Sequence, residues 1–188
     1  MKRLFIALPL QEITKNEIFH GMFSAEPIKN MPVRWTSLQN LHLTLQFLGD
    51  VDEKRIPVLK QIINRLGTSG IQDSLVFTNI GAFPSVSAPR VIWLGIKQND
   101  LLRKMQKRLT FDLILNEFTA DQKKFKPHLT LGRVKENANV SAGMISSLEG
   151  IRANLTITPS PLDRIILFES RLKPGGPEYS ALYEKKFS

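Results

Sequence analysis

Apolar and polar residues alternate along two short segments of the chain, and this alternation predicts two strands. Between residues 40 and 48, every second position is apolar, and the polar positions between them carry His42, Thr44 and Gln46. The segment 126–134 repeats the pattern, with His128 and Thr130 opposite Leu129 and Leu131. Successive side chains of a strand point to opposite faces, so each strand has one apolar and one chemically active face. On this pattern Leu41, Leu43, Leu45 and Phe47 share the apolar face, and we assign Leu41, Leu43, Leu45, Leu129 and Leu131 to the core.

Other segments show the spacing of either strands or amphipathic helices. We predict strands over residues 4–10, 74–80, 90–96, 151–157, 162–169 and 179–187, and helices over 13–23, 52–66, 101–115 and 141–148. Asp100 is the expected N-cap of the third helix, and residues 174–177 form a turn between the last two strands. Since the strands and helices do not alternate strictly, the pattern favours an α+β fold with largely antiparallel sheets.

Length, charge and cysteine content limit the classes of protein that this chain can be. Its 188 residues suffice for one well-buried domain, and we expect residues 1–188 to form a single domain. The net charge of +9 favours binding of polyanions such as nucleic acid. The absence of cysteine excludes disulfides and thiolate catalysis. No apolar run is long enough to span a bilayer and the N-terminus lacks a cleavage site, so we expect a cytoplasmic protein that does not bind membranes.

Two of the three histidines occur in the same four-residue motif, His-Leu-Thr-Leu, which begins at His42 and again at His128. A strand places the histidine and the threonine side by side, so each motif offers an imidazole beside a hydroxyl donor. In-line displacement at phosphorus needs a base for the nucleophile and an acid for the leaving oxygen, and two histidines that face each other across a groove can supply both. The third histidine, His20, lies near the end of a predicted helix, and we interpret it as structural.

Other catalytic classes find no support in the sequence. No phosphate-binding glycine loop (GxxxxGK[ST] or GxGxxG) and no GxSxG nucleophile motif is present. Neither histidine motif has a further histidine or a carboxylate at the spacing of a metal site. We therefore predict a phosphate site that uses no metal and no cofactor.

The paired motifs and the residues around them resemble the RNA 2',3'-cyclic phosphodiesterase family, historically called 2'-5' RNA ligase, of the two-histidine phosphoesterases. The resemblance spans nearly the whole chain. It rests on residues 3–8, 40–49, 83–84, 90–95, 126–133 and 167–172.

This resemblance implies a bilobal, pseudo-twofold fold with one motif per lobe, in which two largely antiparallel sheets line a central groove and the helices lie outside. It also implies hydrolysis of RNA 2',3'-cyclic phosphate ends to 2'-phosphates, with reversible 2'-5' ligation as a side activity. By the same resemblance His42 is the proton donor and His128 the proton acceptor, while Thr44, Thr130 and Arg133 bind the phosphate. Strict alternation places Arg133 on the leucine face, so its assignment requires the strand to end or twist there. We expect a monomer.

Two alternatives remain open from the sequence: a non-catalytic module that binds RNA or phosphate, and a phosphoesterase for a small cyclic phosphate or nucleotide. Basic residues in two segments could follow an RNA backbone, although those on the helix fit a solvated helix face equally well. Phe83 could stack on a terminal base, but core packing is the more usual role for it and for Trp35 and Trp93. The basic residues are Arg103, Lys104, Lys107 and Arg108 on the predicted helix and Lys123, Lys124 and Lys126 before the second motif.

Overall fold

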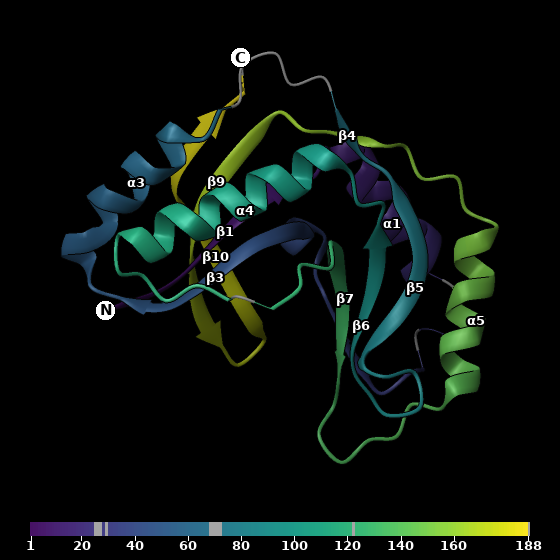
Figure 1. Cartoon of the computed structure of the whole chain (residues 1–188). Helices are drawn as coiled ribbons and strands as arrows, with labels where there is room; N and C mark the ends of the chain where they lie inside the picture. The colour runs from purple at the N-terminus through teal and green to yellow at the C-terminus, as the bar shows by residue number, and fades with distance from the viewer. Residues whose placement is uncertain (25–27, 29, 68–72, 122, 188) are drawn as a thin grey trace.

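The computed structural model describes residues 1–24, 28, 30–67, 73–121 and 123–187. Within these residues the chain forms ten strands, four α-helices and two short 3-10 helices (Figure 1). In chain order these are β1 (Lys2–Pro9), α1 (Glu12–Phe23), β2 (Val33–Trp35), η1 (Leu38–Asn40), β3 (His42–Val51), η2 (Glu53–Arg55), α3 (Ile56–Arg65), β4 (Ser74–Leu75), β5 (Phe77–Pro84), β6 (Pro89–Ile96), α4 (Asp100–Leu115), β7 (His128–Val134), α5 (Ala142–Ala153), β8 (Ser160–Pro161), β9 (Arg164–Lys173) and β10 (Gly176–Lys186).

Eight of the strands form one sheet in the order β10-β9-β1-β3-β7-β6-β5, with β2 added beside β7. Every pairing in it is antiparallel, as the sequence predicted. The prediction of two separate sheets needs correction, because β3 and β7 join the two halves. They do so through a single residue pair, Leu43 opposite Leu129, so the strands diverge on both sides of this point. A second, two-stranded sheet pairs β4 with β8.

The helices lie over both halves of the sheet, and two of them cross from one half to the other. Helix α1 follows β1 but packs beside α5, and α4 follows β6 but packs against α3 and β3 (Figure 1). The hydroxyl of Thr14 on α1 donates to the carbonyl of Thr158 beyond α5. Since each half carries a helix from the other, the buried side chains form one continuous core.

Several predicted elements differ from those observed, and the strand predicted over residues 74–80 is two strands, β4 and β5. Asn99, and not Asp100, caps α4, because its backbone is extended and its side chain accepts a hydrogen bond from the amide of Leu102. The strand predicted over residues 151–157 does not exist, since α5 continues to Ala153. Ile145, Leu148 and Ile151 are three residues apart, which is the spacing of one helix face. That spacing was the signal that the prediction missed, and the short strand β2 was not predicted either.

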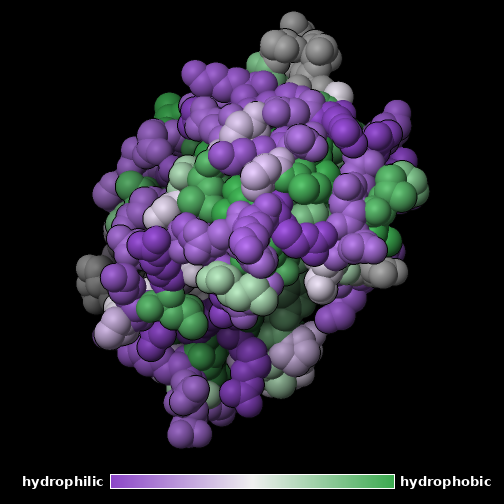
Figure 2. Space-filling view, turned by 90° about the vertical axis from the view of Figure 1, so that its left-hand side faces the viewer, coloured by the Kyte–Doolittle hydropathy of each residue, from purple (hydrophilic) through white to green (hydrophobic). Residues whose placement is uncertain are grey.

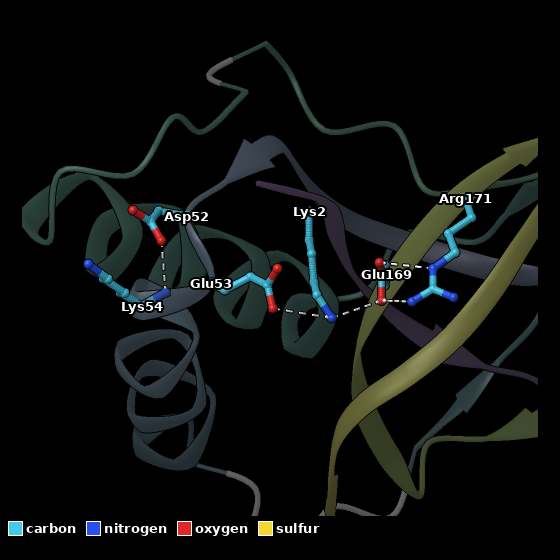
Figure 3. Close-up of polar contacts among 6 residues, drawn as sticks. All are labelled: Lys2, Asp52, Glu53, Lys54, Glu169 and Arg171. Carbon is cyan, nitrogen blue, oxygen red and sulfur yellow. Dashed lines mark hydrogen bonds and ion pairs between the residues drawn. The ribbon is translucent and has the colours of Figure 1, made fainter.

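A polar cluster at the amino end of β1 fixes this strand to two other segments (Figure 3). The ammonium of Lys2 lies 3.3 Å from the carboxylate of Glu169 on β9 and 3.6 Å from that of Glu53 on η2. The guanidinium of Arg171 donates two hydrogen bonds to Glu169, and these bonds are the main reason that the pKa of Glu169 is lowered. The cluster therefore helps to hold β1, the strand that pairs with the first histidine motif.

The side of the molecule that carries α3 is mainly hydrophilic, and its hydrophobic residues form separate patches (Figure 2). Among the described residues, no helix has both the length and the apolar character that crossing a membrane requires.

Candidate active site

The two histidine motifs lie side by side on β3 and β7, at the one point where these strands pair. Leu43 faces Leu129 across the antiparallel pair, and both leucines are fully buried. Their neighbours on each strand therefore point to the other face, where His42 is level with Thr130 and Thr44 with His128. The motifs had been expected to face each other across a groove between two sheets. They are instead neighbours on two antiparallel strands of one sheet.

Both imidazoles are oriented by the same backbone contact. The Nδ1 atom of His42 lies 2.7 Å from the carbonyl oxygen of Asn40, and that of His128 lies 2.7 Å from the carbonyl oxygen of Lys126. A carbonyl only accepts, so each Nδ1 carries a proton and each Nε2 is left to exchange one. Nε2 of His42 lies 3.0 Å from the hydroxyl of Thr44, which donates to it when the imidazole is neutral. The two motifs thus present the same reactive atom.

Each motif ends in a β-bulge at its final leucine. Leu45 has no partner on β1, because Ile6 pairs with Gln46 while Ala7 pairs with Thr44. Leu131 has no partner on β6, because Ile92 pairs with Gly132 while Trp93 pairs with Thr130. An extra residue puts two consecutive side chains on one face and shifts the alternation beyond it. The residue two positions after each bulge therefore returns to the face of the histidines.

This shift explains where Arg133 and Phe47 lie. Arg133 lines the groove, so the condition set for its assignment, a strand that departs from strict alternation, is met by the bulge. Phe47 occupies the matching position in the first motif, and it also lines the groove with 60% of its surface exposed. The prediction that Phe47 shares a face with Leu43 and Leu45 was therefore wrong. Gln46 had been placed on the histidine face, but it is 2% exposed and bonded to Thr110 and Asp121.

A groove of about 1100 Å³ contains the five residues that the sequence singled out, which are His42, Thr44, His128, Thr130 and Arg133. Five cationic side chains and two carboxylates line it, so its net charge favours an anion. The cations are Arg34, Lys123, Lys124, Lys126 and Arg133, and the carboxylates are Asp121 and Glu178. Arg34 lies beside Arg133 across the pair of β2 and β7, and no sequence pattern indicated it because β2 was not predicted.

Aromatic rings surround both histidines. The ring of His42 stacks on Phe5 at a centroid distance of 5.0 Å and meets the edge of Tyr179 at 5.4 Å. His128 packs edge-to-face with Phe83 at 5.1 Å and lies 6.2 Å from Trp93. Phe83 and Trp35 also line the groove, so they are not simply core residues.

The aromatic surroundings lower the basicity of both imidazoles. Burial lowers the pKa of His42 from 6.5 to about 4, partly opposed by the hydrogen bond to the carbonyl of Asn40. Burial also lowers the pKa of His128, against the corresponding bond to Lys126. Both shifts favour the neutral form of the imidazoles at neutral pH.

The third histidine lies outside the groove, and the described residues form no cluster of potential metal ligands. His20 is exposed on α1, where its ring contacts the edge of Phe19, and it does not line the groove. In the part of the chain that the structure describes, no three histidine, aspartate or glutamate side chains gather as a metal site would require.

Both halves of the chain match one known family, and relatives match it over nearly its whole length. The family described as "LigT like Phosphoesterase" matches residues 24–93 and, separately, residues 94–179, so that each match contains one histidine motif. The RNA 2',3'-cyclic phosphodiesterase of Thermotoga maritima is 32% identical, covering 98% of this chain and 95% of its own length. The protein of the same name from Methanocaldococcus jannaschii is also 32% identical, covering 97% of this chain and 99% of its own.

Solved structures show the same fold. A protein of Thermus thermophilus superposes with a TM-score of 0.78 and 26% identity, covering 98% of this chain and 97% of its own. The E. coli LigT structure with 3'-AMP has a TM-score of 0.71 and 22% identity, covering 100% and 98% of the two chains. Matches over both halves, together with full-length relatives above 30% identity, show that this chain belongs to the LigT-like phosphoesterase family.

Proposed function

We propose that this protein hydrolyses RNA 2',3'-cyclic phosphate ends to 2'-phosphates by acid-base catalysis at two histidines, without a metal. The observation that carries the proposal is the pair of imidazoles anchored alike at Nδ1 in one cationic groove, so that Nε2 of each is the atom that exchanges a proton. Substrate takes the place of Thr44 as the partner of Nε2 of His42. The full-length relatives named RNA 2',3'-cyclic phosphodiesterase support this substrate class.

The proposed reaction uses one proton transfer at each histidine. Nε2 of His128 takes a proton from water as the water oxygen attacks phosphorus, and the bond from phosphorus to O3' breaks. Nε2 of His42 gives its proton to O3', which leaves a 3'-hydroxyl and a 2'-phosphate. With a 5'-hydroxyl in place of water, the same transfers form a 2'-5' linkage, and their reversal cleaves it.

Three further side chains bind the phosphate in this proposal. The hydroxyls of Thr44 and Thr130 donate to the non-bridging oxygens, where negative charge increases in the transition state. The guanidinium of Arg133 contacts the same group from beyond the second bulge. Phe47 lies at the matching place beyond the first bulge, and its exposed ring offers a face on which an unpaired base can stack.

We also propose that the chain is one bilobal, pseudo-twofold domain with one motif in each lobe. The separate family matches to residues 24–93 and 94–179 support an internal duplication. The matched bulges after Thr44 and Thr130 support it as well, since unrelated segments have no reason to depart from alternation at the same motif position.

The test is an assay with RNA oligonucleotides that end in a 2',3'-cyclic phosphate, with the product mapped as 2'- or 3'-phosphate. We expect 2'-phosphate from the wild type and a loss of about 100-fold or more in kcat for His42→Ala and for His128→Ala. His20→Ala is the matched control, because this third histidine lies outside the groove, and it should retain full activity.

Three results would contradict the proposal. If the wild-type protein bound the RNA but never hydrolysed it, the protein would be a non-catalytic binding module. Turnover of only small cyclic nucleotides would assign another phosphoesterase substrate. A 3'-phosphate product would mean that the bond to O2' breaks instead of the bond to O3'.

A further inference from the structure

A second hollow of about 750 Å³ adjoins the catalytic groove, between α4 and the residues Asp121, Lys123, Lys124 and Phe125. Both hollows share part of their lining: Gln106, Asp121, Lys123, Lys124 and Phe125. The shared wall is fixed in place, since the side chain of Gln46 accepts a bond from the amide of Asp121 and donates one to its carbonyl. A bound ligand strand that extends out of the groove at this end therefore meets a preformed second surface.

The second hollow is cationic. Arg103 and Lys107 on α4 and Lys123 and Lys124 on the shared wall line it, against the single carboxylate of Asp121. Arg103 forms an ion pair with Asp100, while the three lysines form none within the residues that the structure describes. Lysines without a carboxylate partner are available to a phosphate backbone.

Of the four cations on helix α4, two line this hollow and two do not. Lys104 and Arg108 had been grouped with Arg103 and Lys107 from the sequence, but neither lines the hollow. Arg108 instead pairs with Asp112 at 2.7 Å. Of the two alternatives left open for the helix, contact with RNA therefore suits Arg103 and Lys107, and a solvated helix face suits Lys104 and Arg108.

An exposed aromatic ring lies in the same hollow. Phe111 is 60% exposed and lines it together with Ile114. An exposed phenylalanine beside unpaired lysines is the combination that binds single-stranded nucleic acid, because bases stack on the ring while the cations contact phosphates. Leu115 on the same helix is 69% exposed but does not line the hollow.

We propose that the second hollow is a subsite for the nucleotides upstream of the cyclic phosphate, so that single-stranded RNA runs from the histidines past residues 123–125 to Lys107 and Phe111. The inference rests on the proposed function, because it takes the end of the RNA to lie at His42 and His128. It specifies an oligonucleotide, and not a mononucleotide, as the preferred substrate.

The test compares kcat/KM for a nucleoside 2',3'-cyclic phosphate with that for single-stranded oligonucleotides of increasing length that carry the same terminal group. We expect kcat/KM of the wild type to rise with length until the subsite is filled. Phe111→Ala should reduce the ratio of long to short substrate by about tenfold. Lys107→Gln should reduce it too, and should lower the slope of log kcat/KM against log salt by about 0.7 for the long substrate.

Lys104→Gln and Leu115→Ala are matched controls on the same helix, and both should leave the ratio and the salt slope unchanged. Equal kcat/KM for all lengths in the wild type would overturn this inference while leaving the proposed reaction intact. So would an equal effect of Lys104→Gln and Lys107→Gln. Absence of turnover with every cyclic phosphate would instead overturn the proposed function.

Discussion

The burial of His42 makes a specific prediction about pH. Its pKa falls from 6.5 to about 4, a difference of roughly 3 kcal/mol between its two protonation states at 1.36 kcal/mol per unit. In the empty groove at pH 7, about one molecule in a thousand therefore carries an imidazolium at His42. Burial also lowers the pKa of His128.

The pH dependence of kcat/KM reports the free enzyme, in which one histidine must be neutral and the other protonated. The fraction of enzyme in which one histidine is neutral and the other protonated is largest between the two pKa values, whichever histidine is the acid. We therefore expect a bell-shaped profile for kcat/KM with its maximum below pH 6.5, since both pKa values are lowered from 6.5. A bound phosphate anion favours the imidazolium, so the profile of kcat should lie at higher pH than that of kcat/KM.

The assay is the initial rate with an oligonucleotide cyclic phosphate from pH 4 to pH 9 at constant ionic strength. Imidazole resonances, assigned with His42→Ala and His128→Ala, give the two pKa values in the free protein and with the 2'-phosphate product bound. A maximum of kcat/KM at or above pH 7, with His42 titrating near 6.5, would refute the argument from burial. Activity that rises continuously to pH 9 would refute the two-histidine mechanism itself.

Three further predictions concern stability, packing and metals. Because the pKa of His42 is lower in the folded than in the unfolded protein, its contribution to folding is complete above pH 6.5 and is lost as pH falls to 4, by up to about 3 kcal/mol. Urea titrations of the wild type should show this loss of unfolding free energy relative to His42→Gln. Parallel curves of unfolding free energy against pH for the two proteins would contradict it. A Cβ on Gly81 would lie 2.1 Å from the ring of Trp93, which packs beside His128, so Gly81→Ala should cost roughly 1–3 kcal/mol and lower kcat. The control Gly150→Ala, which meets no atom within 4 Å, should be neutral or stabilising in the same thermal melts, and an equally harmless Gly81→Ala would show that Trp93 moves freely. Turnover should survive EDTA, and activity that returned only with an added divalent ion would contradict metal independence.

The sequence was sufficient to predict features that depend on local patterns. The alternation around His42 and His128 located both central strands, and the duplicated motif identified the pair of histidines. The antiparallel α+β architecture also followed from the order of elements. Failures were of two kinds: helix ends, as at Asn99 and beyond Leu148, and elements such as β2 that depend on distant partners. A three-residue strand has too short a pattern to be recognised without the strand that it pairs with.

The bulges mark the limit of prediction at the site itself. Alternation, continued through Leu45 and Leu131, places both Phe47 and Arg133 on the leucine face of their strands. One unpaired residue in each strand reverses both assignments, and nothing in a single motif reveals it. The duplication offers a way to detect it, because Arg133 could bind phosphate only if its strand departs from alternation after Thr130. The same departure, applied to the other copy, brings Phe47 into the groove, so a functional requirement in one half predicts the geometry of the other.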